Sequence, residues 1–178
     1  VGEEVAELTA GAMNGDLDFA TSLHARVELL KGLETSTFPK ILEQIDLTTG
    51  ANAFIKELHR RGYKVGLVSG GFHEVIDPIA QSLGIDLVQA NRLELADGRL
   101  TGKVLGEIVT PEKKKETLLT WAREFHVEAC QTIAIGDGAN DLPMIKTAGI
   151  GIAFMAKPIV SRLAPYRIET RDLRLVFE

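Results

Sequence analysis

The chain has 178 residues, 45% of them hydrophobic and 25% charged, a balance that fits one ordinary folded domain or one domain with a modest insertion. Its formal net charge of −5 argues against a nucleic-acid binder, and no apolar run approaches the ~18 residues of a membrane span. The single cysteine, Cys130, excludes a disulfide framework and CxxC chemistry. A lone thiol suits a reducing compartment, so we expect a cytoplasmic protein.

The first 45 residues are expected to be helical. Apolar residues recur at helical spacing over 5–30, with Gly15-Asp16 as a turn between two helices, and Pro39 opens a further short helix. Strands and helices alternate only after this stretch. We therefore expect residues 1–45 to form a small helical cap and residues 46–178 to form an α/β core.

The remainder of the chain predicts an α/β fold with a doubly wound, Rossmann-like parallel sheet. The predicted elements are a helix over 51–58, a strand over 64–68, a helix ending at 83, a hairpin around Asp97-Gly98, a helix over 118–125, a strand over 132–136, a helix near 140–147 and a strand over 150–154. In such sheets the site lies at the carboxyl ends of the strands. Because Ser69-Gly70-Gly71 and Asp137 both follow predicted strands, we expect them to converge on one crevice.

The sharpest chemical signal is the segment Gly136-Asp137-Gly138-Ala139-Asn140-Asp141, directly after an apolar run. It places two carboxylates and an amide within five residues, and no His or Cys lies nearby. Oxygen ligands of this kind suit a hard divalent cation such as Mg²⁺. The alternative is a turn in which Asn140 or Asp141 caps a helix. We interpret the segment as a metal site with Asp137 and Asp141 as the ligands.

Three further features are candidates for binding an anion. Ser69-Gly70-Gly71 offers a hydroxyl and exposed backbone N–H groups, although a tight turn explains it equally. The residues alone do not distinguish among the lysines at 113–115, any of which could face a phosphate. Arg26 lies one helical turn after Ser22 and is a candidate clamp for a carboxylate, with a surface arginine as the alternative.

Together these segments resemble the haloacid dehalogenase superfamily of phosphohydrolases, and within it the phosphoserine phosphatases, over essentially the whole chain. Three blocks carry the resemblance: residues 12–27, residues 68–72 and residues 136–141. It implies a Mg²⁺-dependent hydrolase of phosphomonoesters that converts phosphoserine into serine and phosphate through an aspartyl-phosphate. That reaction is the last step of serine biosynthesis, so the expected partner is a small-molecule substrate.

The resemblance also implies residues that bind the substrate. Ser69 looks like the family's phosphate-binding hydroxyl, and the Gly70 backbone N–H lies beside it. In the cap, Arg26 resembles the clamp for the substrate carboxylate. Met13 and Phe19 match apolar residues that close over the serine moiety.

The catalytic and metal-binding residues follow from the same resemblance. Lys114 looks like the lysine that neutralises the phosphate, and Asp137 is similar to the direct Mg²⁺ ligand. Asp141 resembles the acid that supports the metal. Asn140 matches a polar residue that contacts the substrate phosphate and orients Lys114.

One part of the family pattern is missing. The family's opening motif, a strand ending in Asp-x-Asp-x-Thr, supplies the nucleophile and the general acid, and no such motif occurs in the 178 residues. We expect the chain to begin inside the first cap helix, with the nucleophile in a preceding segment. Two alternatives stay open: a phosphoserine-dependent phosphotransferase, and a catalytically dead relative that binds a ligand.

Overall fold

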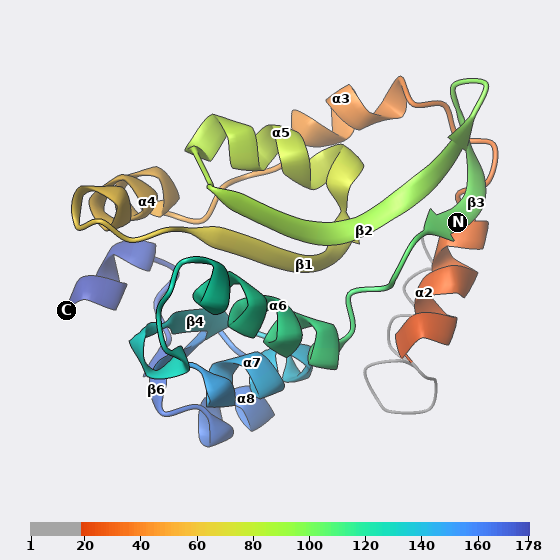
Figure 1. The fold of residues 1–178 in the computed structure, drawn as a ribbon. Helices are drawn as coiled ribbons and strands as arrows, with labels where there is room; N and C mark the ends of the chain where they lie inside the picture. Colours follow the sequence, from red (N-terminus) through yellow and green to blue (C-terminus); the bar gives the residue numbers. More distant parts are fainter. Residues whose placement is uncertain (1–18) are drawn as a thin grey trace. The chain divides into compact units, whose positions relative to one another are not determined.

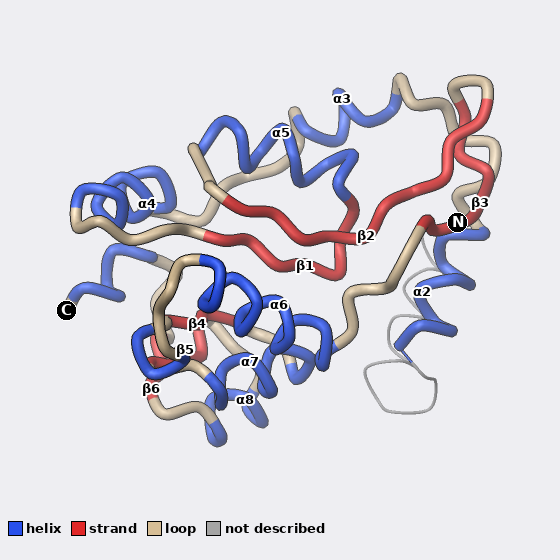
Figure 2. Tube along the Cα trace, viewed as in Figure 1, coloured by secondary structure: helices blue, strands red, loops and turns tan. Residues whose placement is uncertain are grey.

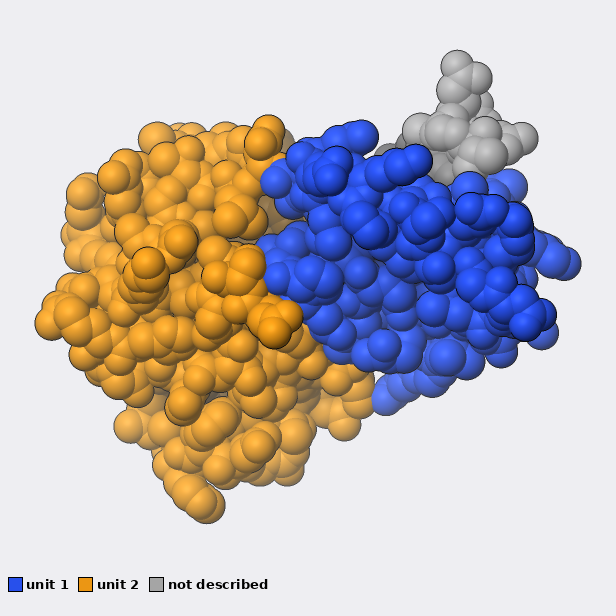
Figure 3. All heavy atoms as spheres, turned by 90° about the horizontal axis from the view of Figure 1, so that it is seen from above, with its two compact units in different colours: residues 1–45, 69–79, 90–108 blue, residues 46–68, 80–89, 109–178 orange. Residues whose placement is uncertain are grey.

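The computed structural model describes residues 19–178 and forms two compact units, coloured separately in Figure 3. Of the described residues, unit 1 contains 19–45, 69–79 and 90–108, and unit 2 contains 46–68, 80–89 and 109–178. The expected division into a cap over 1–45 and a core over 46–178 stays a prediction. The expected helix before Gly15 lies outside the described residues.

Helices and strands alternate along most of the described chain (Figures 1 and 2). The helices are α2 (Phe19–Glu28), α3 (Thr37–Leu42), α4 (Ala51–Arg60), α5 (His73–Leu83), α6 (Pro111–Glu124), α7 (Leu142–Thr147) and α8 (Pro158–Leu163). The strands are β1 (Gly66–Phe72), β2 (Leu87–Ala96), β3 (Arg99–Leu105), β4 (Ile133–Gly136), β5 (Ile150–Phe154) and β6 (Tyr166–Ile168). Short 3₁₀ helices lie between or after these elements: η1 (Ala129–Gln131), η2 (Ala139–Asp141) and η3 (Leu173–Phe177).

The strands form two three-stranded sheets, in the orders β1-β2-β3 and β4-β5-β6. In the second sheet β5 runs parallel to both neighbours, which confirms the predicted α/β class with parallel strands. In the first sheet β2 and β3 form the predicted antiparallel hairpin. Its two turn residues, Asp97 and Gly98, have φ angles of 50° and 72°, as a type I′ turn requires. β1 and β4 each lie at an edge of their own sheet.

Helices cover both faces of the parallel sheet in unit 2. Successive side chains of a strand point to opposite faces, so Ile135 and its neighbours in β4 contact different helices. Ile135 packs against the cluster that α4 builds from Phe54, Ile55 and Leu58, which also includes residues of η3. β4 and β5 also contact α7, and Ala153 of β5 is buried against that helix and α8. The end of β4 is therefore fixed from both sides.

Unit 1 has a separate core. Leu23 and Val27 lie one turn apart on α2 and are buried against Leu93 of β2 and Leu100 of β3. This packing places one face of α2 on the hairpin. It fixes the helix that carries Phe19 and Arg26, the two predicted cap residues that the structure describes.

Some predicted element boundaries were wrong: for example, the short helix expected to open at Pro39 begins at Thr37. The strand predicted over 64–68 begins at Gly66 and continues to Phe72, so Ser69-Gly70-Gly71 lies inside β1 rather than after it. Pairing with β2 outweighs the local preference of glycine for turns. The helix predicted over 118–125 begins at Pro111, because Thr110 caps it by accepting a hydrogen bond from the Lys113 N–H at 3.1 Å.

Candidate active site

A buried ion pair lies at the centre of the site in unit 2. Lys114 projects from the first turn of α6, and its Nζ donates to Oδ1 of Asp141 at 2.6 Å. The two residues are 6% and 5% exposed. A charge this deeply buried is tolerated only where a partner compensates it, and here each residue is the other's partner. The pair joins α6 to the start of α7.

Asp141 also holds the turn that follows β4. Its second oxygen, Oδ2, accepts hydrogen bonds from the backbone N–H groups of Asp137 at 3.1 Å and Gly138 at 3.0 Å. This close approach requires glycine at 136, where a Cβ would lie 2.5 Å from the Cβ of Asp141. The side chain of Asn140 lies against Gly138 in the same way. The two glycines therefore allow the side chains of Asp141 and Asn140 to fold back on the turn.

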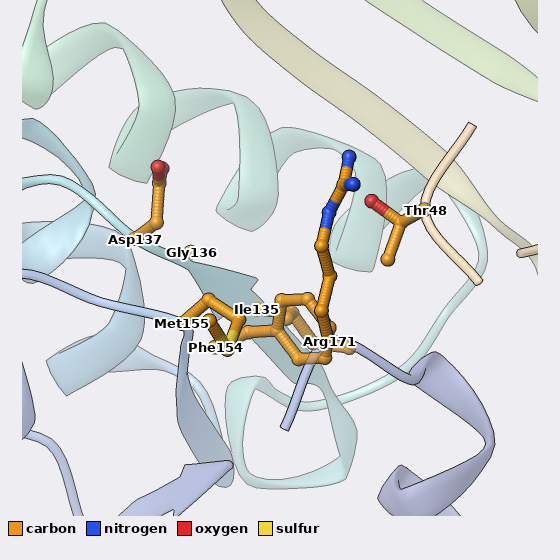
Figure 4. Close-up of a pocket in the computed structure, with 7 residues that line it drawn as sticks. All are labelled: Thr48, Ile135, Gly136, Asp137, Phe154, Met155 and Arg171. Carbon is orange, nitrogen blue, oxygen red and sulfur yellow. The ribbon is translucent and has the colours of Figure 1, made fainter. Parts of the chain in front are cut away.

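Asp137 faces a pocket of about 380 Å³ in unit 2. The pocket is lined by Thr48, Ile135, Gly136, Asp137, Phe154, Met155 and Arg171. Figure 4 shows the Arg171 guanidinium beside Thr48 and the Asp137 carboxylate on the other side of the pocket. The side chain of Asp137 is exposed, whereas that of Asp141 is buried.

The donor set at this turn suits Mg²⁺. Within residues 19–178 no three His, Cys, Asp or Glu side chains gather into a cage. Mg²⁺ does not need one, because it commonly keeps several waters and takes one or two carboxylates together with substrate phosphates. Asp141 already accepts three hydrogen bonds, so Asp137 is the carboxylate better placed to coordinate directly. That either residue binds a metal stays a prediction.

In unit 1, Ser69 is held by its own strand. Its Oγ accepts a hydrogen bond from the Gly71 N–H at 3.0 Å, which leaves the hydroxyl hydrogen available to donate elsewhere. The Phe19 ring of α2 lies beside Gly70, with Cζ 3.3 Å from the position that a Cβ would take. The structure therefore brings Phe19 next to the predicted phosphate-binding segment.

Arg26 lies two helical turns after Phe19 on the same face of α2. Its Nε donates to the Ser22 carbonyl at 3.2 Å, and the side chain is partly buried. Burial lowers the pKa of this guanidinium because desolvation disfavours its charged form. A carboxylate beside it would compensate that cost.

Comparison with known proteins decides the family. The family model described as haloacid dehalogenase-like hydrolase matches residues 5–146. The phosphoserine phosphatase of Streptococcus thermophilus is 59% identical over 178 residues, which are 100% of this chain and 83% of that protein. The chain belongs to the phosphoserine phosphatase family of haloacid dehalogenase-like hydrolases. The predicted resemblance is confirmed.

Solved structures of this family agree with the fold. One, described as a substrate-bound phosphoserine phosphatase complex, has a TM-score of 0.92 and 46% identity, and the match covers 98% of this chain and 83% of the other. Another, described as a phospho-aspartyl intermediate analogue of phosphoserine phosphatase, has a TM-score of 0.91 and 46% identity, with 98% and 84% covered. No helix within residues 19–178 has the length and apolarity to span a membrane.

The structure groups the predicted site residues by unit. Unit 2 brings together Lys114, Asp137, Asn140 and Asp141, and unit 1 holds Phe19, Arg26, Ser69 and Gly70. The expected convergence of Ser69 and Asp137 stays a prediction, as do the roles of all these residues. Met13 lies outside the described residues.

Sequence reasoning missed three residues that the structure places at these groups. Thr48 and Arg171 line the pocket beside Asp137 but lie far from it in the chain, and neither belongs to a recognisable motif. Asn91 is 1% exposed and donates from Nδ2 to the Gly70 carbonyl at 2.9 Å.

Proposed function

We propose that this protein is a Mg²⁺-dependent phosphatase that hydrolyses phosphoserine to serine and phosphate, as the last step of serine biosynthesis in the cytoplasm. The observation that carries the proposal is the buried Lys114–Asp141 pair beneath the turn that presents the Asp137 carboxylate. An ammonium and a cation bound to the Asp137 carboxylate would together provide the positive charge that phosphoryl transfer needs. The matches to phosphoserine phosphatases support the same substrate.

Asp137 would hold the Mg²⁺, with Asp141 in support. When bound, the ion would neutralise negative charge on the phosphoryl oxygens. Lys114 adds a second positive charge. Its ammonium has three N–H donors, and Asp141 accepts from one of them. The others can serve a phosphate oxygen and Asn140.

Ser69 and Gly70 would bind the substrate phosphate through two donors. Because the Ser69 Oγ already accepts from the Gly71 N–H, its own O–H is the group left to donate to a phosphate oxygen. The Gly70 backbone N–H is the second donor. Glycine at 70 also leaves space for the Phe19 ring, since a Cβ there would approach that ring to 3.3 Å.

Residues of α2 would bind the amino-acid end of the substrate. Arg26 can pair with the substrate carboxylate, which would offset the desolvation that lowers the pKa of the partly buried guanidinium. Phe19 would close over the serine moiety and exclude water. Met13 is expected to do the same.

The chemical step uses an aspartate nucleophile. An Asp carboxylate oxygen attacks phosphorus, the bond from phosphorus to the serine oxygen breaks, and the leaving serine takes a proton from a general acid. Water then hydrolyses the aspartyl-phosphate. The nucleophile and acid are expected in an Asp-x-Asp-x-Thr motif that these 178 residues do not contain. The solved relative described as a phospho-aspartyl intermediate analogue supports this covalent route.

The test is release of phosphate from phosphoserine by the full-length protein, with Mg²⁺ and with a chelator. We expect turnover with Mg²⁺ alone, with serine and phosphate in equal amounts. A protein that turns over only when a second hydroxyl compound is added, and phosphorylates it, would instead be the phosphotransferase. Binding of phosphoserine without turnover would indicate the catalytically dead relative.

A further inference from the structure

One peptide unit in β1 is held at both ends by side chains. The peptide between Gly70 and Gly71 has its carbonyl bound by Asn91 Nδ2 at 2.9 Å and its N–H bound to the Ser69 Oγ at 3.0 Å. A peptide unit is planar, so fixing the carbonyl fixes the direction of the N–H. Rotation of this unit would move the N–H that holds the serine hydroxyl.

The surroundings of Gly71 leave little room for a side chain at this position. A Cβ at Gly71 would lie 3.0 Å from Cδ1 of Ile76 and 3.2 Å from the Ser69 Oγ. Glycine is the residue that permits this close packing, but glycine is also the residue whose backbone is least restricted by its own side chain. A segment with two successive glycines therefore depends on external contacts to select one conformation, and Asn91 adds a side-chain contact to the pairing of β1 with β2.

Asn91 is itself fixed by the residues around it. The Ala90 N–H donates to Nε2 of His73 at 3.2 Å, and the Leu93 N–H donates to Oε2 of Glu74 at 3.3 Å. Both acceptors belong to the first turn of α5, directly after β1. β2 is thus attached to the start of α5 on either side of Asn91, and the Asn91 side chain is 1% exposed.

We infer that Asn91 is a positioning residue for phosphate binding, acting on the Ser69 hydroxyl through the Gly70–Gly71 peptide. This inference rests on the proposed function, in which Ser69 donates to the phosphate. Loss of the Asn91 donor releases the peptide and lets the serine hydroxyl leave its bound orientation. The role of Asn91 is therefore to position Ser69 from a buried site in β2.

A double-mutant cycle between Asn91 and Ser69 tests this coupling in the full-length protein. The measurements are kcat and KM for phosphoserine and the Kd for inorganic phosphate. Asn91→Asp keeps the size of the side chain and removes the N–H donor, and Ser69→Ala removes the hydroxyl. Asn91→Ala removes the donor without introducing a charge and replaces Asn91→Asp if that protein does not fold. Asn52→Asp, on the exposed face of α4, makes the same chemical change away from the site.

Ser69→Ala is expected to lower kcat/KM and weaken phosphate binding by about 10- to 100-fold, as loss of a charge-assisted hydrogen bond does. Asn91→Asp is expected to cost about 10-fold when Ser69 is present and less than about 2-fold when it is absent, because interacting residues are not additive. Asn52→Asp should change neither constant. Equal losses from Asn91→Asp in both backgrounds would overturn the inference, since a residue that only supports the fold acts without Ser69.

The phosphate measurement separates this inference from the proposed function. In one outcome, the wild-type protein hydrolyses no phosphoserine while the Asn91 and Ser69 variants still show coupled losses in phosphate binding. That result would rule out phosphoserine as the substrate and support the role of Asn91. A wild-type protein that binds no phosphate would overturn both.

Discussion

Replacing Asp141 with Asn should strongly destabilise the protein, because the substitution leaves a buried ammonium without its counter-charge. The Asp141 carboxylate accepts hydrogen bonds from Lys114 Nζ at 2.6 Å and from the N–H groups of Asp137 and Gly138 at 3.1 and 3.0 Å. An Asn oxygen can still accept from the backbone, but the amide cannot neutralise Lys114, which is 6% exposed. Breaking one partner of a buried pair costs about 3–5 kcal/mol.

For a chain of this size, that loss lowers Tm by about 6–20 °C. The assay is urea and thermal unfolding of the full-length protein followed by circular dichroism. Adding Lys114→Met to Asp141→Asn should recover part of the loss, because the second change removes the unpaired charge. Glu116→Gln is the matched control: it breaks the exposed Lys113–Glu116 pair at 3.1 Å and should cost less than about 1 kcal/mol. If Asp141→Asn costs no more than Glu116→Gln, the buried pair does not have the role we assign to it.

Three further predictions address specificity, acid stability and the nucleophile. Arg26→Ala should lose about 2–5 kcal/mol of transition-state stabilisation on phosphoserine and little on a phosphoester without a carboxylate, and equal losses in kcat/KM on both would refute its role as a clamp. Burial raises the pKa of Asp86, but hydrogen bonds from Lys64, the Val65 N–H and His59 outweigh it and lower this pKa to about 2. The ionised Asp86 therefore stabilises the fold above its unfolded pKa of ~4, and this contribution is lost as the pH falls towards about 2. Asp86→Asn should make the stability depend less on pH in that range. An acid transition identical to that of the wild type would argue against this role of Asp86. A polypeptide of residues 1–178 alone should release no phosphate from phosphoserine with Mg²⁺, whereas measurable turnover would show that an Asp within these residues is the nucleophile.

The fold could largely be predicted from local patterns. The apolar spacing of α4, the Asp-Gly turn of the β2–β3 hairpin and the apolar run of β5 each depend on residues close in the chain. The boundaries that failed depended on distant contacts or on a cap. β1 extends through Ser69-Gly70-Gly71 because β2 pairs with it, and no local signal in a glycine-rich stretch indicates that.

The site residues also differ in how far the sequence alone could predict them. The Asp137–Asp141 segment was recognisable because its chemistry lies within five residues. The choice of Lys114 from a lysine triplet needed the family resemblance, and the structure adds the reason: this lysine is buried against Asp141, whereas Lys113 pairs with the exposed Glu116. Asn91 was missed because its contact with Gly70 joins two strands, and its role appears only when both are placed.

The most direct test of the account is the Mg²⁺ dependence of phosphoserine hydrolysis by Asp137→Asn in the full-length protein. The side chain of Asp137 is exposed on the pocket, so the substitution should leave the circular dichroism spectrum and Tm close to wild type. Removal of the charged ligand should abolish Mg²⁺-dependent turnover, since a bound dication contributes several kcal/mol to the transition state. Near-normal turnover by Asp137→Asn at low Mg²⁺ would contradict the assignment of this turn as the metal site.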